Sequence, residues 1–195
     1  MGIARNLAAL LDSSGDVVAG ALDNAGGGGA WEVISSQTVT TAVSSVELTG
    51  LDSTYGKHVV HFSGGTATDD IMYIKYGSAT SYATSATDYR ATQHYYGSLH
   101  GELDQASTTF HKLHAISGVY INFELTLHGI GTTGRVYVDG TTQSDRAAQL
   151  LYGGEVHGSY ANTPALAIDR LTLYTEGGAN ISSGTIITVY GIKTS

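Results

Sequence analysis

The sequence contains no cysteine, a single proline and few charged residues among its 195 positions. Without cysteine, neither disulfides nor thiolate metal sites can form, so stability must come from burial or from assembly with other chains. The lone proline, Pro164, suits a protein built from β-ladders, because each proline removes a backbone donor from a ladder. Charged residues make up 13% of the chain, against about 25% in typical soluble domains.

Basic charge is scarcer still. The chain carries 9 Lys and Arg against 17 Asp and Glu, a formal net charge of -8, and shows no basic cluster. Because phosphate backbones are bound by clustered Lys and Arg, nucleic acid is not an expected partner. There is also no apolar run of about 20 residues, so we expect no membrane insertion. Leu7–Leu11 is too short for a secretory signal, which favours assembly in the cytoplasm.

The first 30 residues differ in pattern from the rest. Ile3, Leu7, Leu10 and Leu11 share one face of a predicted short helix, and Val17, Val18 and Leu22 follow after a turn. Residues 24–30, NAGGGGA, form a flexible glycine-rich linker. Residues 1–23 are too few to form their own core, so their apolar side must dock on the same chain or on another protein. The linker favours another protein, and we interpret residues 1–23 as an anchor.

From Trp31 onward the apolar period is two. In residues 119–130 the side chains of Val119, Ile121, Phe123, Leu125 and Leu127 share one face of a predicted strand, and the opposite face is polar. Similar runs occupy residues 31–39, 43–51, 56–64, 71–77, 135–140, 165–175 and 184–193. Turn-forming stretches are predicted at 50–56, 63–70, 130–134, 139–145 and 175–184. About eight to ten short strands predict an all-β fold, an antiparallel β-sandwich or jelly roll over residues 31–195.

The last predicted strand is apolar on both faces. Ile186, Thr188, Tyr190 and Ile192 lie on one side, and Ile187 and Val189 on the other. A strand with two apolar faces is typical of a covered position rather than an open sheet edge.

Histidines and acids show no arrangement that would support catalysis. His58 and His61, like His111 and His114, are three residues apart, and on a strand such pairs point to opposite faces. We therefore expect packing or solvated histidines and no metal or other cofactor; a cross-strand metal site, or an acid-sensitive histidine cluster at a subunit interface, is the alternative. No nucleophile motif or convergent pair of acids is present, with Glu102 and Asp104 in an irregular polar stretch, so we expect no enzyme activity.

Tyrosines gather in residues 76–105 among Ser, Thr and Ala. Tyrosine offers a large contact area at low entropic cost, as in adaptable binding loops. Two interpretations remain: packing under a loop or at an interface, or contact with a ligand such as a host glycan. The candidate recognition residues are Tyr82, Tyr89, Arg90, His94, Tyr95 and Tyr96.

Three stretches, residues 4–26, 31–62 and 177–193, resemble small virion proteins of tailed bacteriophages: head decoration proteins, short fibres and tail-fibre modules. The shared positions are Trp31, Tyr55, Gly184, Thr185, Tyr190 and Gly191. The resemblance implies a homotrimeric β domain held on the virion through its N-terminal segment. The expected function is therefore a structural virion protein displayed on capsid or tail, with a carbohydrate- or receptor-binding tail-fibre module as the alternative.

Overall fold

The computed structural model describes residues 31–68, 70–78, 81–82, 89–96, 101–108, 111–113, 120–146, 150–160 and 167–193. The predicted anchor and linker, residues 1–23 and 24–30, lie outside this part of the chain. The described residues form thirteen strands: β1 (Trp31–Thr38), β2 (Ser45–Thr49), β3 (Lys57–Gly64), β4 (Met72–Ser78), β5 (Ser81–Tyr82), β6 (Tyr89–Tyr96), β7 (Gly101–Thr108), β8 (His111–Leu113), β9 (Tyr120–His128), β10 (Val136–Arg146), β11 (Leu150–Tyr160), β12 (Arg170–Thr175) and β13 (Ile186–Ile192).

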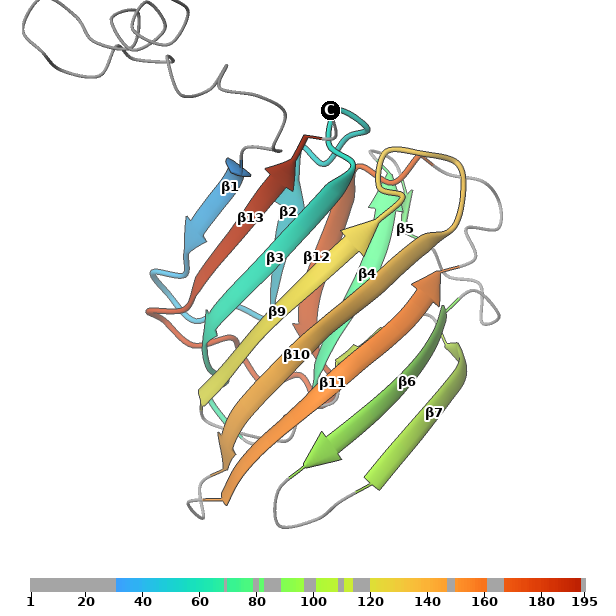
Figure 1. The fold of residues 1–195 in the computed structure, drawn as a ribbon. Helices are drawn as coiled ribbons and strands as arrows, with labels where there is room; N and C mark the ends of the chain where they lie inside the picture. The colour runs from blue at the N-terminus through green and yellow to red at the C-terminus, as the bar shows by residue number, and fades with distance from the viewer. Residues whose placement is uncertain are drawn as a thin grey trace, which may run out of the picture.

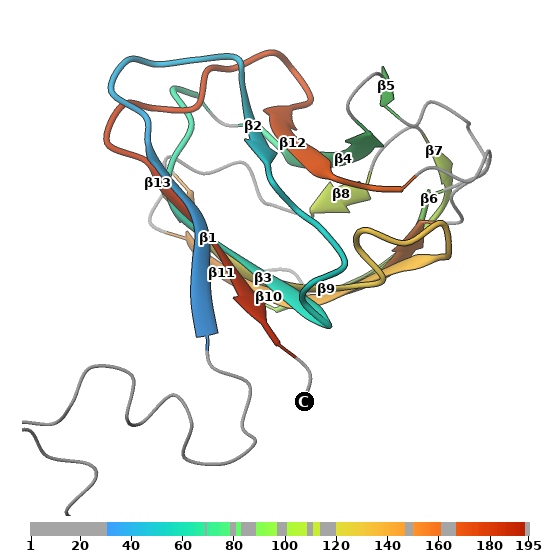
Figure 2. The same ribbon diagram turned by 90° about the horizontal axis from the view of Figure 1, so that it is seen from above.

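The strands form two sheets packed face to face (Figures 1 and 2). The large sheet has the order β1-β13-β3-β9-β10-β11-β6-β7, and the small sheet has the order β2-β12-β4-β5, with β8 also paired to β4. Each strand pairing is antiparallel. The chain repeatedly crosses from one sheet to the other, as it does between β1, β2, β3 and β4. The protein is thus an antiparallel β-sandwich, as the period-two pattern predicts.

The core lies between the two sheets and follows the predicted alternation. Ile121, Phe123, Leu125 and Leu127 of β9 are all buried. The Phe123 ring stacks on Phe62 of β3, with ring centroids 4.8 Å apart. The small sheet contributes its own inward residues to the same cluster: Val46, Leu48, Met72, Ile74, Tyr76, Leu171 and Leu173. Burial of each apolar face against the other gives both sheets their stability in water.

The terminal strand β13 occupies a covered position. It pairs with β1 on one side and β3 on the other, so the prediction that it is not an edge strand is confirmed. Ile187 and Val189 are fully buried in the core, while Ile186 on the opposite face is 47% exposed. On that outer face the ring of Tyr190 meets Trp31 of β1 edge-on, at 5.6 Å between centroids.

One predicted turn is wrong. Residues 139–145 belong to β10, which pairs with β9 on one side and β11 on the other. Hydrogen bonding to two neighbours outweighs the turn propensity of this Gly- and Thr-rich stretch. Gly140 itself lies so close to β9 that a Cβ atom there would sit 2.2 Å from the Glu124 carbonyl oxygen. Glu102 and Asp104, expected in an irregular stretch, lie in β7.

Candidate binding groove

The outer face of the small sheet carries polar and aromatic side chains at matched positions. The register places Thr172 of β12 between Glu47 of β2 and Lys75 of β4. Two residues further along the same face, Tyr174 lies opposite Ser45. Leu171 and Leu173, on either side of Thr172 in β12, point into the core, so alternation brings Thr172 and Tyr174 to the solvent face.

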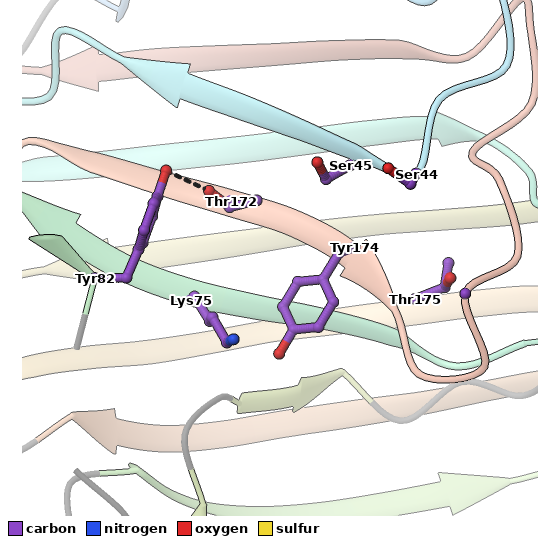
Figure 3. Close-up of a pocket in the computed structure, with 8 residues that line it drawn as sticks. Ser44, Ser45, Lys75, Tyr82, Thr172, Tyr174 and Thr175 are labelled. Carbon is purple, nitrogen blue, oxygen red and sulfur yellow. Dashed lines mark hydrogen bonds between the residues drawn. The ribbon is translucent and has the colours of Figure 1, made fainter. Parts of the chain in front are cut away.

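A groove of about 410 Å³ lies over this face. Its lining includes Ser45, Lys75, Tyr82, Thr172, Tyr174 and Thr175. Figure 3 shows Tyr82 and Tyr174 rising at two places along the groove, with Lys75 between them and Thr172 close to the Tyr82 hydroxyl. The groove thus has two aromatic rings, several hydroxyl groups and one ammonium group within a small volume.

Tyr82 is held in place by hydrogen bonds at its hydroxyl group. The hydroxyl donates to Glu47 Oε2 and accepts from Thr172 Oγ1 at 2.6 Å. Glu47 in turn pairs with Arg170, whose Nη1 lies 3.3 Å from Glu47 Oε1. A tyrosine from the two-residue strand β5 is therefore fixed against both β2 and β12.

Lys75 and Tyr174 form the other part of the groove. The Lys75 Nζ atom lies 4.9 Å from the centroid of the Tyr174 ring. Within the described part of the chain, Lys75 makes no ion pair. The Tyr174 ring also meets Tyr73 edge-on at 5.5 Å, and burial raises the pKa of the Tyr174 phenol well above its usual range. The Tyr174 side chain is therefore neutral at physiological pH, and its ring packs against Tyr73.

This arrangement suits binding rather than acid–base chemistry. General acid–base catalysis needs a group free to exchange a proton with a bound substrate. The carboxylate of Glu47 is engaged by Arg170 and by the Tyr82 hydroxyl. Aromatic rings beside hydroxyl and ammonium donors instead match a ligand with a flat apolar side and several oxygen atoms.

The candidate recognition residues do not form one site. Tyr82 lines the groove on the small sheet. Arg90 is exposed, and its register partner Ser159 places it on the outer face of the large sheet, across the sandwich from the groove. The prediction of Tyr89 as a surface recognition residue is wrong. Its ring is fully buried and stacks on Tyr76, and its hydroxyl accepts a hydrogen bond from the Tyr76 backbone N–H at 3.1 Å. Alternation along β6 turns Tyr89 into the core and Arg90 out of it.

The remaining predicted residues divide between β6 and the N-terminal segment. His94 is half-buried and lies opposite Glu155 of β11. The backbones of Tyr95 and Tyr96 pair with Gly154 and Gly153, while their side chains lie outside the described part of the structure. The anchor residues also lie outside it: Ile3, Leu7, Leu10, Leu11, Val17, Val18 and Leu22.

The groove residues Lys75, Thr172 and Tyr174 were not among those predicted from the sequence. A partial signal was nevertheless present: Thr172 and Tyr174 occupy outward positions in β12, whose alternation is clear, and Lys75 is the one charged residue in the largely apolar strand β4. What the pattern lacked was the pairing of β4 with β12, which links segments about a hundred residues apart. Only that pairing makes their side chains neighbours.

Asp70 is a buried carboxylate with a structural role. Its oxygens accept hydrogen bonds from the backbone N–H groups of Ile71 at 2.8 Å, Gly177 at 2.8 Å and Ala179 at 3.0 Å. Burial opposes ionisation, but the hydrogen bonds from Gly177, Ala179 and Ile71 outweigh it and lower the pKa below its usual value. The carboxylate ties the turn after β12 to the connection between β3 and β4.

His58 is a buried histidine in β3. Its ring meets Tyr55 edge-on at 5.7 Å, and its Nε2 atom has no hydrogen-bond partner among the residues that the structure describes. Burial lowers the pKa of His58 to about 4, so the imidazole is neutral at physiological pH. His61, three residues on, is exposed, as the predicted opposite orientation requires. Among the described residues, no three His, Asp or Glu side chains are arranged to hold a metal ion.

Comparison with known proteins identifies no family. No protein-family model matches the chain, and no curated protein matches it. Among solved structures, the Caenorhabditis elegans galectin LEC-6 aligns at a TM-score of 0.32 with 10% identity, over 81% of this chain and 95% of the galectin. A structure of the infectious bursal disease virus Gx strain aligns at a TM-score of 0.12 with 11% identity, over 87% of this chain and 37% of the viral chain. The sandwich is established by the strand pairing described above. In the described residues no helix is long and apolar enough to cross a membrane.

Proposed function

We propose that this protein is a structural component of a tailed-phage particle, attached through residues 1–23 and displaying its β-sandwich on the particle surface. The protein acts by binding and assembly, without catalysis. The sequence resemblance supports this function, and the placement of Trp31 carries it. Trp31 begins β1 and pairs with Ile192 of β13, so the chain enters the sandwich at the same end of the large sheet at which its last strand ends. A tether at that end leaves the outer face of the small sheet open (Figures 1 and 2).

Removing residues 1–23 tests the attachment. The truncated protein should fold as a β domain, because the described core is built from residues 31–193. Purified particles should then contain full-length protein and lack the truncated form. A truncated protein that incorporates at the normal level would contradict the anchor.

The proposal includes a homotrimer. Large apolar side chains are exposed on the outer face of the large sheet: Trp31, Val33, Tyr120, Tyr137 and Ile186. Trp31 and Val33 lie on the same face of β1 beside Tyr190 of β13, and exposed apolar surface of this kind is typical of contact between subunits. Sedimentation of the full-length protein at micromolar concentration should give the mass of three chains, and a monomer would overturn this part of the proposal.

A second candidate function is recognition of a carbohydrate or another receptor on the host surface, and the groove over the small sheet favours it. Its rings and hydroxyl groups offer the contacts by which proteins hold sugars. A glycan array with the full-length protein should show binding to one class of glycan. Uniformly negative arrays would remove this candidate and leave the structural role untouched.

A further inference from the structure

We propose that the groove over the small sheet binds a saccharide that carries a carboxylate group, with Lys75 as the residue that selects the acid. This inference rests on the recognition function proposed above and names its ligand class and site. It departs from the recognition residues predicted on β6, of which Arg90 lies across the sandwich from the groove.

The two tyrosine rings provide preformed contact surfaces. Tyr82 is fixed by its hydrogen bonds to Glu47 and Thr172, and Tyr174 is backed by Tyr73. Rings that are already ordered lose little entropy when a ligand binds. The flat apolar side of a pyranose can therefore pack on either ring at low cost.

The charges in the groove favour one negative group on the ligand. Glu47, the acid at its edge, pairs with Arg170 at 3.3 Å, and Arg170 also pairs with Asp169 at 2.9 Å. Lys75 has no such counter-ion among the described residues and lies beside the Tyr174 ring. An ammonium group without a counter-ion beside an aromatic ring is well placed to bind a carboxylate. The net charge of -8 repels polyanions, which favours a ligand with a single acidic group.

The hydroxyl groups and the size of the groove are consistent with a short saccharide. The side chains of Ser45 and Thr172 lie on the groove surface and can exchange hydrogen bonds with ligand hydroxyls. Its volume of about 410 Å³ lies near the lower end of the range for small-molecule sites, roughly 300 to 1,000 Å³. One or two sugar rings fill such a space.

Calorimetric titration of the full-length protein tests the proposal. The probes are sialyllactose and a glucuronic acid disaccharide, each compared with lactose. At least one acidic probe should bind about tenfold more tightly than lactose, the difference expected for a charge-assisted hydrogen bond. Lys75→Met should remove that preference, so that the acidic probes bind no more tightly than lactose, and added salt should weaken binding of the acidic probes to the wild-type protein more than binding of lactose.

Three further variants locate the site. Lys57→Met, which removes an exposed cation from the large sheet, should change nothing. Tyr82→Phe keeps the ring but removes the two hydrogen bonds of the hydroxyl group, whereas Tyr82→Ala removes the ring as well. The affinity for every probe should fall about tenfold or more in the alanine variant and less in the phenylalanine variant. Circular dichroism of each variant checks that the sandwich is intact.

The outcomes separate the two levels of the proposal. Equal binding of lactose and both acidic probes, unaffected by Lys75→Met, overturns the acidic ligand and keeps the recognition function. Binding that is lost in Arg90→Met and kept in Lys75→Met places the site on the large sheet and overturns the groove. Binding of no sugar by the wild-type protein overturns both.

Discussion

Replacing Asp70 should destabilise the sandwich far more than replacing an exposed acid. The carboxylate accepts hydrogen bonds from Ile71, Gly177 and Ala179, and it is 8% exposed. A hydrogen bond to a charged group contributes about 1.5 to 3 kcal/mol. Gly177 is exposed, so water can replace its partner, whereas Ile71 and Ala179 are partly buried. Losing the bonds to Ile71 and Ala179 gives an expected cost of about 3 kcal/mol for Asp70→Ala, a large share of a typical stability of about 5 to 15 kcal/mol.

Urea unfolding of the full-length protein at pH 7 measures this cost. Asp139→Asn is the matched control, because Asp139 contacts His157 at 3.0 Å on the exposed face of the large sheet. An exposed pair of this kind contributes less than about 1 kcal/mol. Asp70→Asn adds a test by pH. Because the native pKa of Asp70 is lowered, its stabilisation is present above the unfolded pKa and is lost as the pH falls through the native value.

The difference in unfolding free energy between the wild-type protein and Asp70→Asn should accordingly become smaller from pH 7 to pH 3. Two results would refute the reasoning. One is a free energy of unfolding for Asp70→Ala that lies within about 0.5 kcal/mol of that of the Asp139→Asn control, about the error of such measurements. The other is a difference in unfolding free energy between the wild-type protein and Asp70→Asn that does not change with pH.

Two other perturbations test the core. The pKa of His58 is lowered from 6.5 to about 4 in the folded protein. Because the unfolded chain therefore binds a proton at a higher pH than the folded protein does, the free energy of unfolding falls as the pH falls from 6.5 to 4. The loss is at most about 3 kcal/mol at pH 4. The melting temperature of the wild-type protein should therefore fall relative to that of His58→Leu as the pH drops, and a difference between the two that does not change with pH would contradict a buried neutral imidazole. Deleting residues 186–195 should abolish folding, because it removes the fully buried Ile187 and Val189, at about 1.5 to 3 kcal/mol each, and leaves β1 and β3 without their shared neighbour. Deleting residues 193–195 alone should leave the melting temperature close to that of the full-length protein, and a cooperative melt of the longer deletion near that temperature would show that β13 is not integral.

The sequence predicted the fold class because alternation is a local property. In β9 the inward residues Ile121, Phe123 and Leu125 are apolar, and a strand with one buried side needs no more than that pattern. The same reasoning placed β13 inside a sheet. It failed for β6, β7 and β11, where glycines and polar residues blur the alternation and where pairing with neighbouring strands supplies the stability. Tyr89 was misplaced for a related reason: without the strand boundaries, its parity could not be assigned.

The candidate site depended on tertiary structure. By itself the sequence determined which residues are apolar, which segments alternate and that no cysteine framework exists. Whether Tyr82, Lys75 and Tyr174 meet is a matter of which strands pair, and antiparallel strands can pair across any separation in the chain. The pairing of β12 with β2 and β4 is decided by the joint burial of their inward faces against the large sheet. The outward side chains are brought together as a consequence of that burial, which is why the groove exists only in the folded protein.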